Sequence, residues 1–237
     1  MAIGDLKVKI FADGADLAGM VDLARHAWVK GFTTNPTLMA KAGVRDYAAF
    51  AAEALAAIPD RPISFEVFSD DFGEMERQAR VIAGWGRNVY VKIPVTNTQR
   101  ASSVDLIRRL SHDGIKLNVT AVMSLTQVET VVGALKGGAP SCISVFAGRI
   151  ADTGRDPVPH LTRALEIMAV EPRTELVWAS PRELLNIFQA DAIRCHIITV
   201  TSDILQKLAL VGRDLDDFSL DTVRMFHADG QRVHFAV

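Results

Sequence analysis

The sequence predicts an α/β protein of the (β/α)8 type, a closed TIM barrel of eight parallel strands surrounded by helices. Strand-like and helix-like patterns alternate eight times along the chain, which is typical of a parallel sheet. Successive strands follow at an interval of roughly 25 to 30 residues, as in such barrels. No segment rich in Pro, Gly and Ser divides the 237 residues, a length that one barrel often fills. We therefore expect a single domain, residues 1–237, with an extra C-terminal helix and tail over about 214–237.

Eight apolar or alternating runs are expected to form the strands. They cover residues 6–12, 31–33, 63–68, 89–93, 115–119, 142–147, 175–179 and 196–200. An open, doubly wound sheet is the alternative arrangement of the same units. That alternative is disfavoured because no glycine-rich nucleotide fingerprint follows the first strand.

Capping residues and helical periodicity predict the helices between these strands. Asp46, Asp71 with Glu74, and Ser124 with Gln127 have the spacing of helix starts. Pro36 and Pro157 suit a first helical position, and Ser180-Pro181 with Glu183 also predicts a sharp helix start. We expect helices from residue 14 to about 29, from 36, 46–58, 71–84, 104–113, 124–136, 157–168, from 180, 203–211 and 217–227, with a polar loop at 148–156.

Composition excludes several classes of function. A net charge of -2 and a pI near 6.3 argue against nucleic acid or an anionic membrane surface as a partner. The first 20 residues lack the apolar core of a signal peptide, so no signal peptide is expected. No run of 18 apolar residues exists, so no membrane-spanning helix is expected. Cys142 and Cys195 lie in strand-like runs and are expected to be buried and reduced, in a cytoplasmic protein. Neither the cysteines nor the six histidines have metal-ligand spacing, so no metal is expected.

The stretch NVYVKIPV (88–95) carries the most informative residue, because Lys92 interrupts a buried strand that Pro94 closes. A buried ammonium is costly unless it is paired or loses its proton. One interpretation is a structural ion pair with a carboxylate. The other is a desolvated amine that acts as a nucleophile and forms a Schiff base with a carbonyl.

Polar residues recur at the carboxyl ends of the other predicted strands, where barrel enzymes carry their chemistry. Taken alone, each has a structural explanation: Asp13 as a turn residue, Asn35 before Pro36 as a turn dipeptide, Glu66 as the partner of Lys92. Together they place carboxylates, amides, hydroxyls and arginines at one mouth of the barrel. That combination suits carbonyl chemistry on a polyhydroxylated, phosphorylated substrate. The residues are Asp13, Thr33, Thr34, Asn35, Glu66, Lys92, Asn118, Thr120, Ser144, Arg149, Ser180 and Arg182.

Seven segments over nearly the whole chain resemble the transaldolase family, in its compact branch, which also contains the fructose-6-phosphate aldolases. They are ADGADL (12–17), GFTTNPT (31–37), SFEVF (64–68), VYVKIPV (89–95), LNVTAV (117–122), SVFAGRI (144–150) and ASPRE (179–183). The resemblance implies a class I aldolase-type enzyme of the pentose phosphate pathway that works without a cofactor. No metal is needed in such a mechanism, because the protonated imine polarises the substrate.

The resemblance also implies a role for each candidate residue. Lys92 would form the Schiff base, Asp13 would act as the general acid/base, and Glu66 and Thr120 would hold the water that shuttles protons. Asn35, Asn118 and Ser144 would bind the dihydroxyacetone hydroxyls, beside Thr33. Arg149, Ser180 and Arg182 would bind the phosphate, a role that also suits arginine and a helix N-terminus.

Two residues bear on the choice between transfer and simple aldol cleavage. The related fructose-6-phosphate aldolases usually carry Gln and Tyr where this chain has Glu66 and Phe146. A phenol near the intermediate could orient a water that releases free dihydroxyacetone, and Phe146 cannot. The resemblance therefore favours a transaldolase acting on fructose 6-phosphate and erythrose 4-phosphate. An aldolase, an enzyme with another acceptor, and a sugar-phosphate-binding barrel without this chemistry remain alternatives.

Two features depart from the family pattern. Pro181 stands where an aromatic residue is common, and the tail over 225–237 matches no family motif. Compact members often form rings of subunits through the C-terminal helix. We therefore expect a homo-oligomer, and sugar phosphates as the only other partners.

Overall fold

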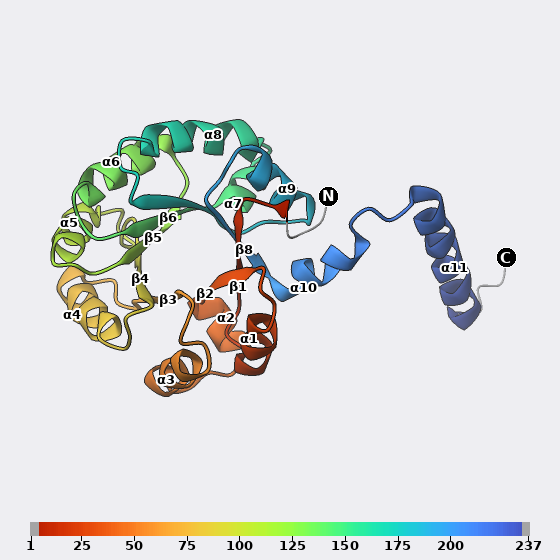
Figure 1. The fold of residues 1–237 in the computed structure, drawn as a ribbon, viewed down its shortest axis with the longest axis horizontal. Helices are drawn as coiled ribbons and strands as arrows, with labels where there is room; N and C mark the ends of the chain where they lie inside the picture. Colours follow the sequence, from red (N-terminus) through yellow and green to blue (C-terminus); the bar gives the residue numbers. More distant parts are fainter. Residues whose placement is uncertain (1–4, 234–237) are drawn as a thin grey trace.

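Eight parallel strands pair in sequence order and close into a barrel, which confirms the predicted fold (Figure 1). The structure is a computed structural model that describes residues 5–233. The strands are β1 (Lys9–Asp13), β2 (Val29–Thr33), β3 (Ile63–Glu66), β4 (Val89–Pro94), β5 (Leu117–Val122), β6 (Ser141–Val145), β7 (Thr174–Trp178) and β8 (Ile197–Thr201).

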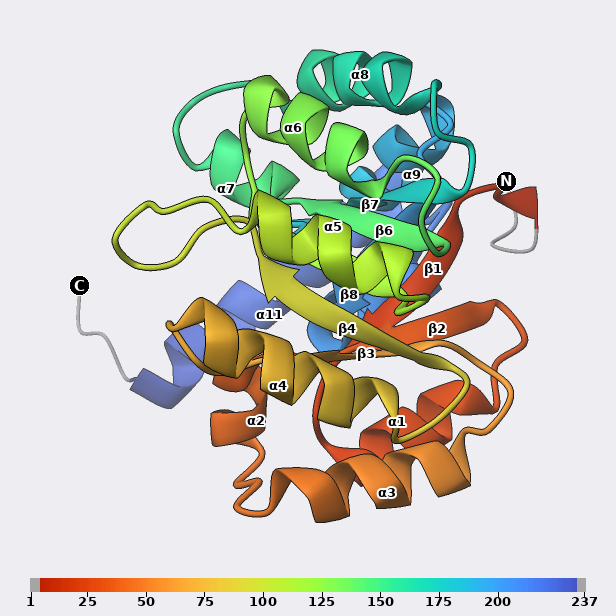
Figure 2. The ribbon, with the colours of Figure 1, turned by 90° about the vertical axis from the view of Figure 1, so that its left-hand side faces the viewer.

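Helices surround the barrel, and α4, α5, α6 and α8 lie side by side over one flank of it (Figure 2). Three predicted helix starts are confirmed, because Asp46, Asp71 and Ser124 each accept a backbone N–H three residues further on. The helices are α1 (Leu17–Ala24), α2 (Pro36–Lys41), α3 (Tyr47–Ala57), α4 (Phe72–Ala83), α5 (Val104–His112), α6 (Leu125–Leu135), α7 (Ala147–Ala151), α8 (Pro157–Met168), α9 (Leu185–Ala192), α10 (Ser202–Leu205) with the 3-10 turn η2 (Gln206–Leu210), and α11 (Leu215–Val233).

Some predicted boundaries are wrong. The first helix ends at Ala24, and Val29 is instead the fully buried first residue of β2. The polar loop predicted at 148–156 contains part of α7. Ser180 does not cap a helix: it has φ of +60°, and α9 begins only at Leu185. The N–H groups of Arg182 and Glu183 bond to the side chain of Asn186 instead, so the helix supplies this acceptor from inside its own first turn.

The barrel interior divides into an apolar half and a polar half. Phe11, Cys142, Val177 and Ile197 form a cluster of their own, and Tyr90 packs against it. Gly31 makes room for it, since a Cβ there would lie 2.6 Å from the ring of Phe11. Side chains alternate between the two faces of a strand. The residues two positions further along therefore also point inward, at the carboxyl end, and they are Asp13, Ser144, Ala179, Thr199 and Lys92.

Helix α11 stands clear of the barrel (Figure 1), and none of residues 211–232 is buried. The helix exposes large apolar side chains, namely Leu215, Phe218, Leu220, Val223, Met225 and Phe226. Within residues 5–233, no helix combines the length and apolar character needed to cross a membrane.

Candidate active site

A cavity of about 540 Å³ opens at the carboxyl ends of the strands. Of the residues singled out in the sequence as catalytic or substrate-binding, all but Asn118 line it. Those residues are Asp13, Thr33, Asn35, Glu66, Lys92, Thr120, Ser144, Phe146, Arg149, Ser180 and Arg182. Asn118 joins the group indirectly, because its Oδ1 accepts a hydrogen bond of 2.7 Å from Ser144. The fold thus brings together residues spread over 170 positions of sequence, from 13 to 182.

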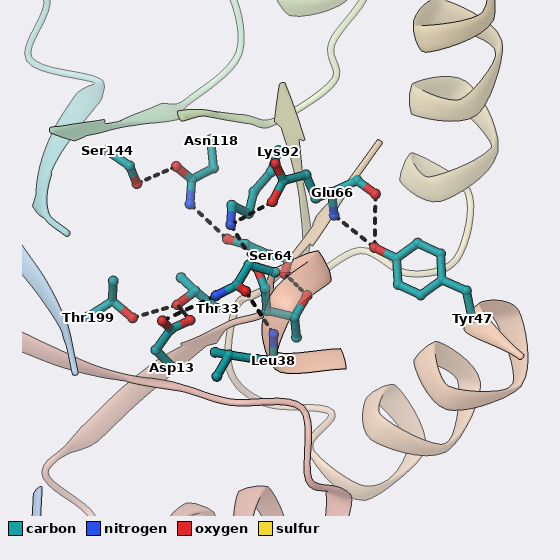
Figure 3. A network of polar contacts seen from close by, with 12 residues as sticks. Asp13, Thr33, Leu38, Tyr47, Ser64, Glu66, Lys92, Asn118, Ser144 and Thr199 are labelled. Atoms are coloured by element: carbon teal, nitrogen blue, oxygen red, sulfur yellow. Dashed lines mark hydrogen bonds and ion pairs between the residues drawn. The ribbon is translucent and has the colours of Figure 1, made fainter. Parts of the chain in front are cut away.

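Lys92 is buried in β4, with 6% of its surface exposed. Its Nζ donates to the backbone carbonyl of Thr34 at 2.7 Å. It also lies 3.0 Å from Oε2 of Glu66 (Figure 3). Strand register explains the ion pair, since Glu66 on β3 is directly paired with Lys92 on β4. Two acceptors therefore satisfy an ammonium that would otherwise be costly to bury.

Asp13 lies at the end of β1 within a chain of hydroxyl groups. Thr33 Oγ1 donates to its Oδ1 at 2.7 Å, and Asn35 Nδ2 approaches its Oδ2 at 3.5 Å. Because that bond uses the only proton of Thr33, Thr199 must be the donor in the 2.5 Å contact between the two threonine hydroxyls. Burial raises the pKa of Asp13 above its ordinary value, against the lowering effects of the Lys92 charge and the Thr33 hydrogen bond.

Asn35 has two functions that do not compete. Its Oδ1 accepts the N–H of Leu38 at 2.9 Å and so caps α2, with Pro36 at the first helical position. The cap fixes the orientation of the amide, and its Nδ2 faces Asp13. Asn35 therefore has the structural role expected of a residue before Pro36, and it also lies at the candidate site.

On the far side of the mouth lie a chain of side-chain hydrogen bonds and a β-bulge with a positive φ. Asn118 donates to Ser64 Oγ at 3.1 Å and accepts from Ser144, which links β3, β5 and β6 (Figure 3). Beyond it, the β5–β6 register shifts between Val119 and Val122, and Ala121 has φ of +60°. Such bulges redirect side chains near functional sites. Here the irregular stretch includes Thr120, which lines the cavity.

Two arginines and a tight backbone contact form the cationic end of the cavity. Arg182 makes a two-pronged ion pair with Asp152, with Nε at 3.0 Å from Oδ1. Arg149, exposed on α7, has no hydrogen-bonded partner within residues 5–233. Between them the loop at Ser180 passes over Gly148, where a Cβ would lie 1.6 Å from the Ser180 carbonyl oxygen. Only glycine fits at that crossing.

Several residues in or beside this site were not singled out in the sequence, and Tyr47, Ser64 and Thr199 contact the candidate residues directly. Tyr47 lies in the helix predicted at 46–58, and its hydroxyl bonds to both backbone groups of Glu66. Ser64 and Thr199 lie within the strands predicted at 63–68 and 196–200. The alternation along β3 and β8 was the available signal, since Ser64 precedes Glu66 by two positions and Thr199 follows Ile197 by two.

The cysteines take no part in this site. Cys142 and Cys195 are buried and free, as predicted. Burial raises the pKa of each thiol to about 12, which keeps them protonated and unreactive. Across residues 5–233, the His, Cys, Asp and Glu side chains form no group of three or more suited to a metal ion.

The fold and the position of the cavity define a (β/α)8 barrel with the site at its carboxyl end, where barrel enzymes act. A solved structure shares the fold: a dihydrodipicolinate synthase from Rhodopseudomonas palustris superposes with a TM-score of 0.55 at 14% identity, over 93% of this chain and 80% of that one.

Comparison with known families is more specific. The family model for Transaldolase/Fructose-6-phosphate aldolase matches residues 10–236. A "Probable transaldolase" of Dehalococcoides mccartyi is 35% identical over 202 residues, covering 85% of this chain and 90% of that protein. Another, from Herpetosiphon aurantiacus, is 32% identical over 95% of this chain and 96% of that protein. The chain therefore belongs to the transaldolase/fructose-6-phosphate aldolase family and is an enzyme of that family.

Proposed function

We propose that this enzyme is a transaldolase that moves a dihydroxyacetone unit between sugar phosphates through a Schiff base on Lys92. The observation that carries the proposal is the buried amine of Lys92, held at the cavity by Thr34 and Glu66. The substrates we assign are fructose 6-phosphate and erythrose 4-phosphate, with glyceraldehyde 3-phosphate and sedoheptulose 7-phosphate as products. With those substrates, the enzyme we propose acts in the pentose phosphate pathway and in the cytoplasm.

In the first step, the Lys92 amine attacks the C2 carbonyl of the ketose and water leaves, giving an iminium. The amine must first lose a proton, and the Glu66 carboxylate 3.0 Å away can receive it directly. The departing oxygen then needs a proton in return. Glu66 and the hydroxyl of Thr120 both line the cavity, and they are positioned to hold the water that carries it.

In the second step, the Asp13 carboxylate takes the proton of the C4 hydroxyl and the C3–C4 bond breaks. The bonding electron pair moves into the iminium, which becomes an enamine, and an aldose phosphate leaves. Burial raises the pKa of Asp13, which makes its carboxylate a stronger base for this transfer. A second aldose phosphate then accepts the three-carbon unit by the reverse of these steps.

The remaining candidate residues suit the two ends of the substrate. The amides of Asn35 and Asn118 and the hydroxyls of Thr33 and Ser144 lie near Asp13 and Lys92, where the dihydroxyacetone hydroxyls would bind. Arg149, the Ser180 loop and Arg182 would bind the phosphate. Arg149 is the better-placed cation, since Asp152 already neutralises Arg182.

An aldolase that releases free dihydroxyacetone is the alternative. Phe146 favours transfer, because it lines the cavity and its ring has no hydroxyl that could orient a water toward the enamine. Product analysis with the acceptor omitted separates the two functions. A transaldolase accumulates the enamine and releases little dihydroxyacetone, whereas rapid release under these conditions would establish the aldolase. Phe146→Tyr is expected to increase the release.

We also propose that the protein is a homo-oligomer. Helix α11 exposes six large apolar residues along 19 positions and stands clear of its own barrel. A monomer rarely leaves such a surface in water. A second copy of the chain would cover it.

Borohydride trapping tests the Schiff base. The protein is incubated with fructose 6-phosphate, reduced and digested, and the peptide containing Lys92 is weighed. A dihydroxyacetone-sized adduct on Lys92 is expected, and Lys92→Met should abolish it together with transfer. Lys116→Met is the matched control, because the Lys116 amine binds a carbonyl outside the cavity. Absence of the adduct with both fructose 6-phosphate and sedoheptulose 7-phosphate would refute the proposal.

A further inference from the structure

The hydrogen-bond ladder between β2 and β3 is interrupted beside the site. Thr34 N–H donates to the Ser64 carbonyl at 3.1 Å, as a parallel ladder requires. The next bond of the same pattern would run from the Glu66 N–H to the Thr34 carbonyl. Instead, the Glu66 N–H donates to the hydroxyl oxygen of Tyr47 at 2.8 Å (Figure 3).

This interruption leaves an acceptor for the lysine. The Thr34 carbonyl, without the N–H of Glu66, accepts from Lys92 Nζ at 2.7 Å. Tyr47 also donates to the Glu66 carbonyl at 3.1 Å, so its hydroxyl holds the backbone of Glu66 on both sides of the residue. The Glu66 side chain is the second acceptor of Nζ. The phenol oxygen of Tyr47 therefore takes the N–H that would occupy one acceptor of the amine, and it holds the backbone of the residue that provides the other.

The rest of the fold holds Tyr47 in place. It is the first residue of α3, which Asp46 caps. Its ring packs against Phe65, Phe68 and Trp85, with centroid distances of 6.0, 4.7 and 5.2 Å. Burial raises the pKa of the Tyr47 phenol well above its ordinary value. The hydroxyl therefore stays protonated and can donate and accept at the same time.

We propose that Tyr47 is a positioning residue for the Schiff-base step. Its hydroxyl takes the place of a strand partner for Glu66, and so leaves the Thr34 carbonyl free to orient the Lys92 amine. The inference rests on the proposed function, because it assigns Tyr47 a task in the chemistry of Lys92. Tyr47 does not line the cavity, so its effect on substrate is indirect.

Removal of the hydroxyl should misplace the amine without disturbing substrate binding. In Tyr47→Phe the partly buried Glu66 N–H loses its acceptor, and the Thr34 carbonyl is the acceptor to which it can turn. Lys92 then loses that carbonyl. Because displacement of a reacting group by about 1 Å can cost on the order of a hundredfold in rate, kcat should fall roughly ten- to a hundredfold. KM should stay within about twofold, since the groups assigned to the phosphate are untouched.

The chain offers a matched control in Tyr90, its only other tyrosine. Tyr90 precedes Lys92 by two residues on β4, and its hydroxyl makes no hydrogen bond to the part of the chain that the structure describes. Tyr90→Phe removes the same atom from the apolar half of the barrel and should leave kcat and KM unchanged. Steady-state kinetics and the rate of borohydride trapping are measured for both variants. An unchanged kcat in Tyr47→Phe, or an equal loss in Tyr90→Phe, would overturn the proposal.

A crystal structure of Tyr47→Phe gives a readout that needs no activity. The expected result is a hydrogen bond from Glu66 N to Thr34 O, with Lys92 Nζ displaced from that oxygen. A lysine still bound to Thr34 would overturn the inference. If the unaltered enzyme forms no Schiff base, the proposed function fails, and this comparison still decides whether Tyr47 orients Lys92.

A subtler change covers the case in which Tyr47→Phe does not fold. In the Tyr90→Phe protein Tyr47 is the sole tyrosine, so biosynthetic 3-fluorotyrosine replaces it alone. Fluorine makes the phenol oxygen a weaker acceptor while ring and hydroxyl remain. We expect kcat to fall severalfold at constant KM, and an unchanged kcat would count against the proposal.

Discussion

Removal of the Thr33 hydroxyl should move the acid limb of the pH–rate profile. Thr33 Oγ1 donates to Asp13 Oδ1 at 2.7 Å, and this bond lowers the carboxyl pKa, which burial raises. In the proposed mechanism Asp13 accepts a proton and must be ionised. Activity is therefore lost as the pH falls through its pKa. Without the hydrogen bond the ionised form is less stable, the pKa rises further, and the acid limb of kcat moves to higher pH.

The size of the shift follows from the geometry of the bond. A short hydrogen bond to a charged group contributes about 1.5 kcal/mol at the lower end of its usual range. Since one pKa unit corresponds to about 1.36 kcal/mol, Thr33→Val should shift the limb by about one pH unit. The variant also leaves the buried hydroxyl of Thr199 without its 2.5 Å partner. We therefore expect a loss of about 1–3 kcal/mol in the free energy of unfolding.

The assay is kcat against pH over the range in which both proteins remain folded, with stability from denaturant unfolding. Thr33→Ser is the matched control, because it keeps the hydroxyl and should leave the limb in place. A Thr33→Val enzyme that is folded and active, with its acid limb where the unaltered enzyme has it, would refute the assignment of Asp13 as the ionised base. A limb shifted to lower pH would refute the sign of the argument.

Three further outcomes follow from the structure. Gly148→Ala should force the Ser180 loop away, because the new Cβ would lie 1.6 Å from the Ser180 oxygen. The temperature of thermal unfolding should fall and KM should rise. Gly133→Ala, where a Cβ has open space, should change neither quantity. Arg149→Gln should raise KM for fructose 6-phosphate roughly tenfold or more, since a charged hydrogen bond to phosphate is lost; equal KM values would place the phosphate elsewhere. Phe226→Ser on α11, where the side chain is 65% exposed, should shift sedimentation toward the monomer, and an unchanged oligomer would exclude this face as the interface.

The barrel, and the residues that lie at its carboxyl end, could be predicted because both follow from simple rules. Alternation of strands and helices gives the parallel sheet, and the carboxyl ends of neighbouring strands meet at one rim. That rule alone brings Asp13, Lys92 and Arg182 together. Helix boundaries were less predictable. The pattern at Ser180-Pro181 has the residue types of a helix start, but the backbone there must cross Gly148 and takes a positive φ instead.

Contacts within the mouth could not be predicted, because they depend on register. Whether Glu66 N–H meets the Thr34 carbonyl or Tyr47 depends on where β2 and β3 stop pairing, and the sequence contains no local sign of that position. Likewise, Thr199 reaches Thr33 only because β1 lies between β8 and β2 in the closed barrel. Such contacts arise from strands that are far apart in sequence, so no spacing or capping pattern reports them.

The structural and the chemical explanations of these residues describe the same contacts. The ion pair between Lys92 and Glu66 makes a buried ammonium tolerable, and it also places a proton acceptor 3.0 Å from the amine. Asn35 caps α2 with one atom of its amide and faces Asp13 with the other. In both cases the bond that stabilises the fold fixes the orientation of the reacting group. The active geometry is therefore maintained by the interactions that end the strands and begin the helices, and a substitution that weakens one should impair both stability and rate.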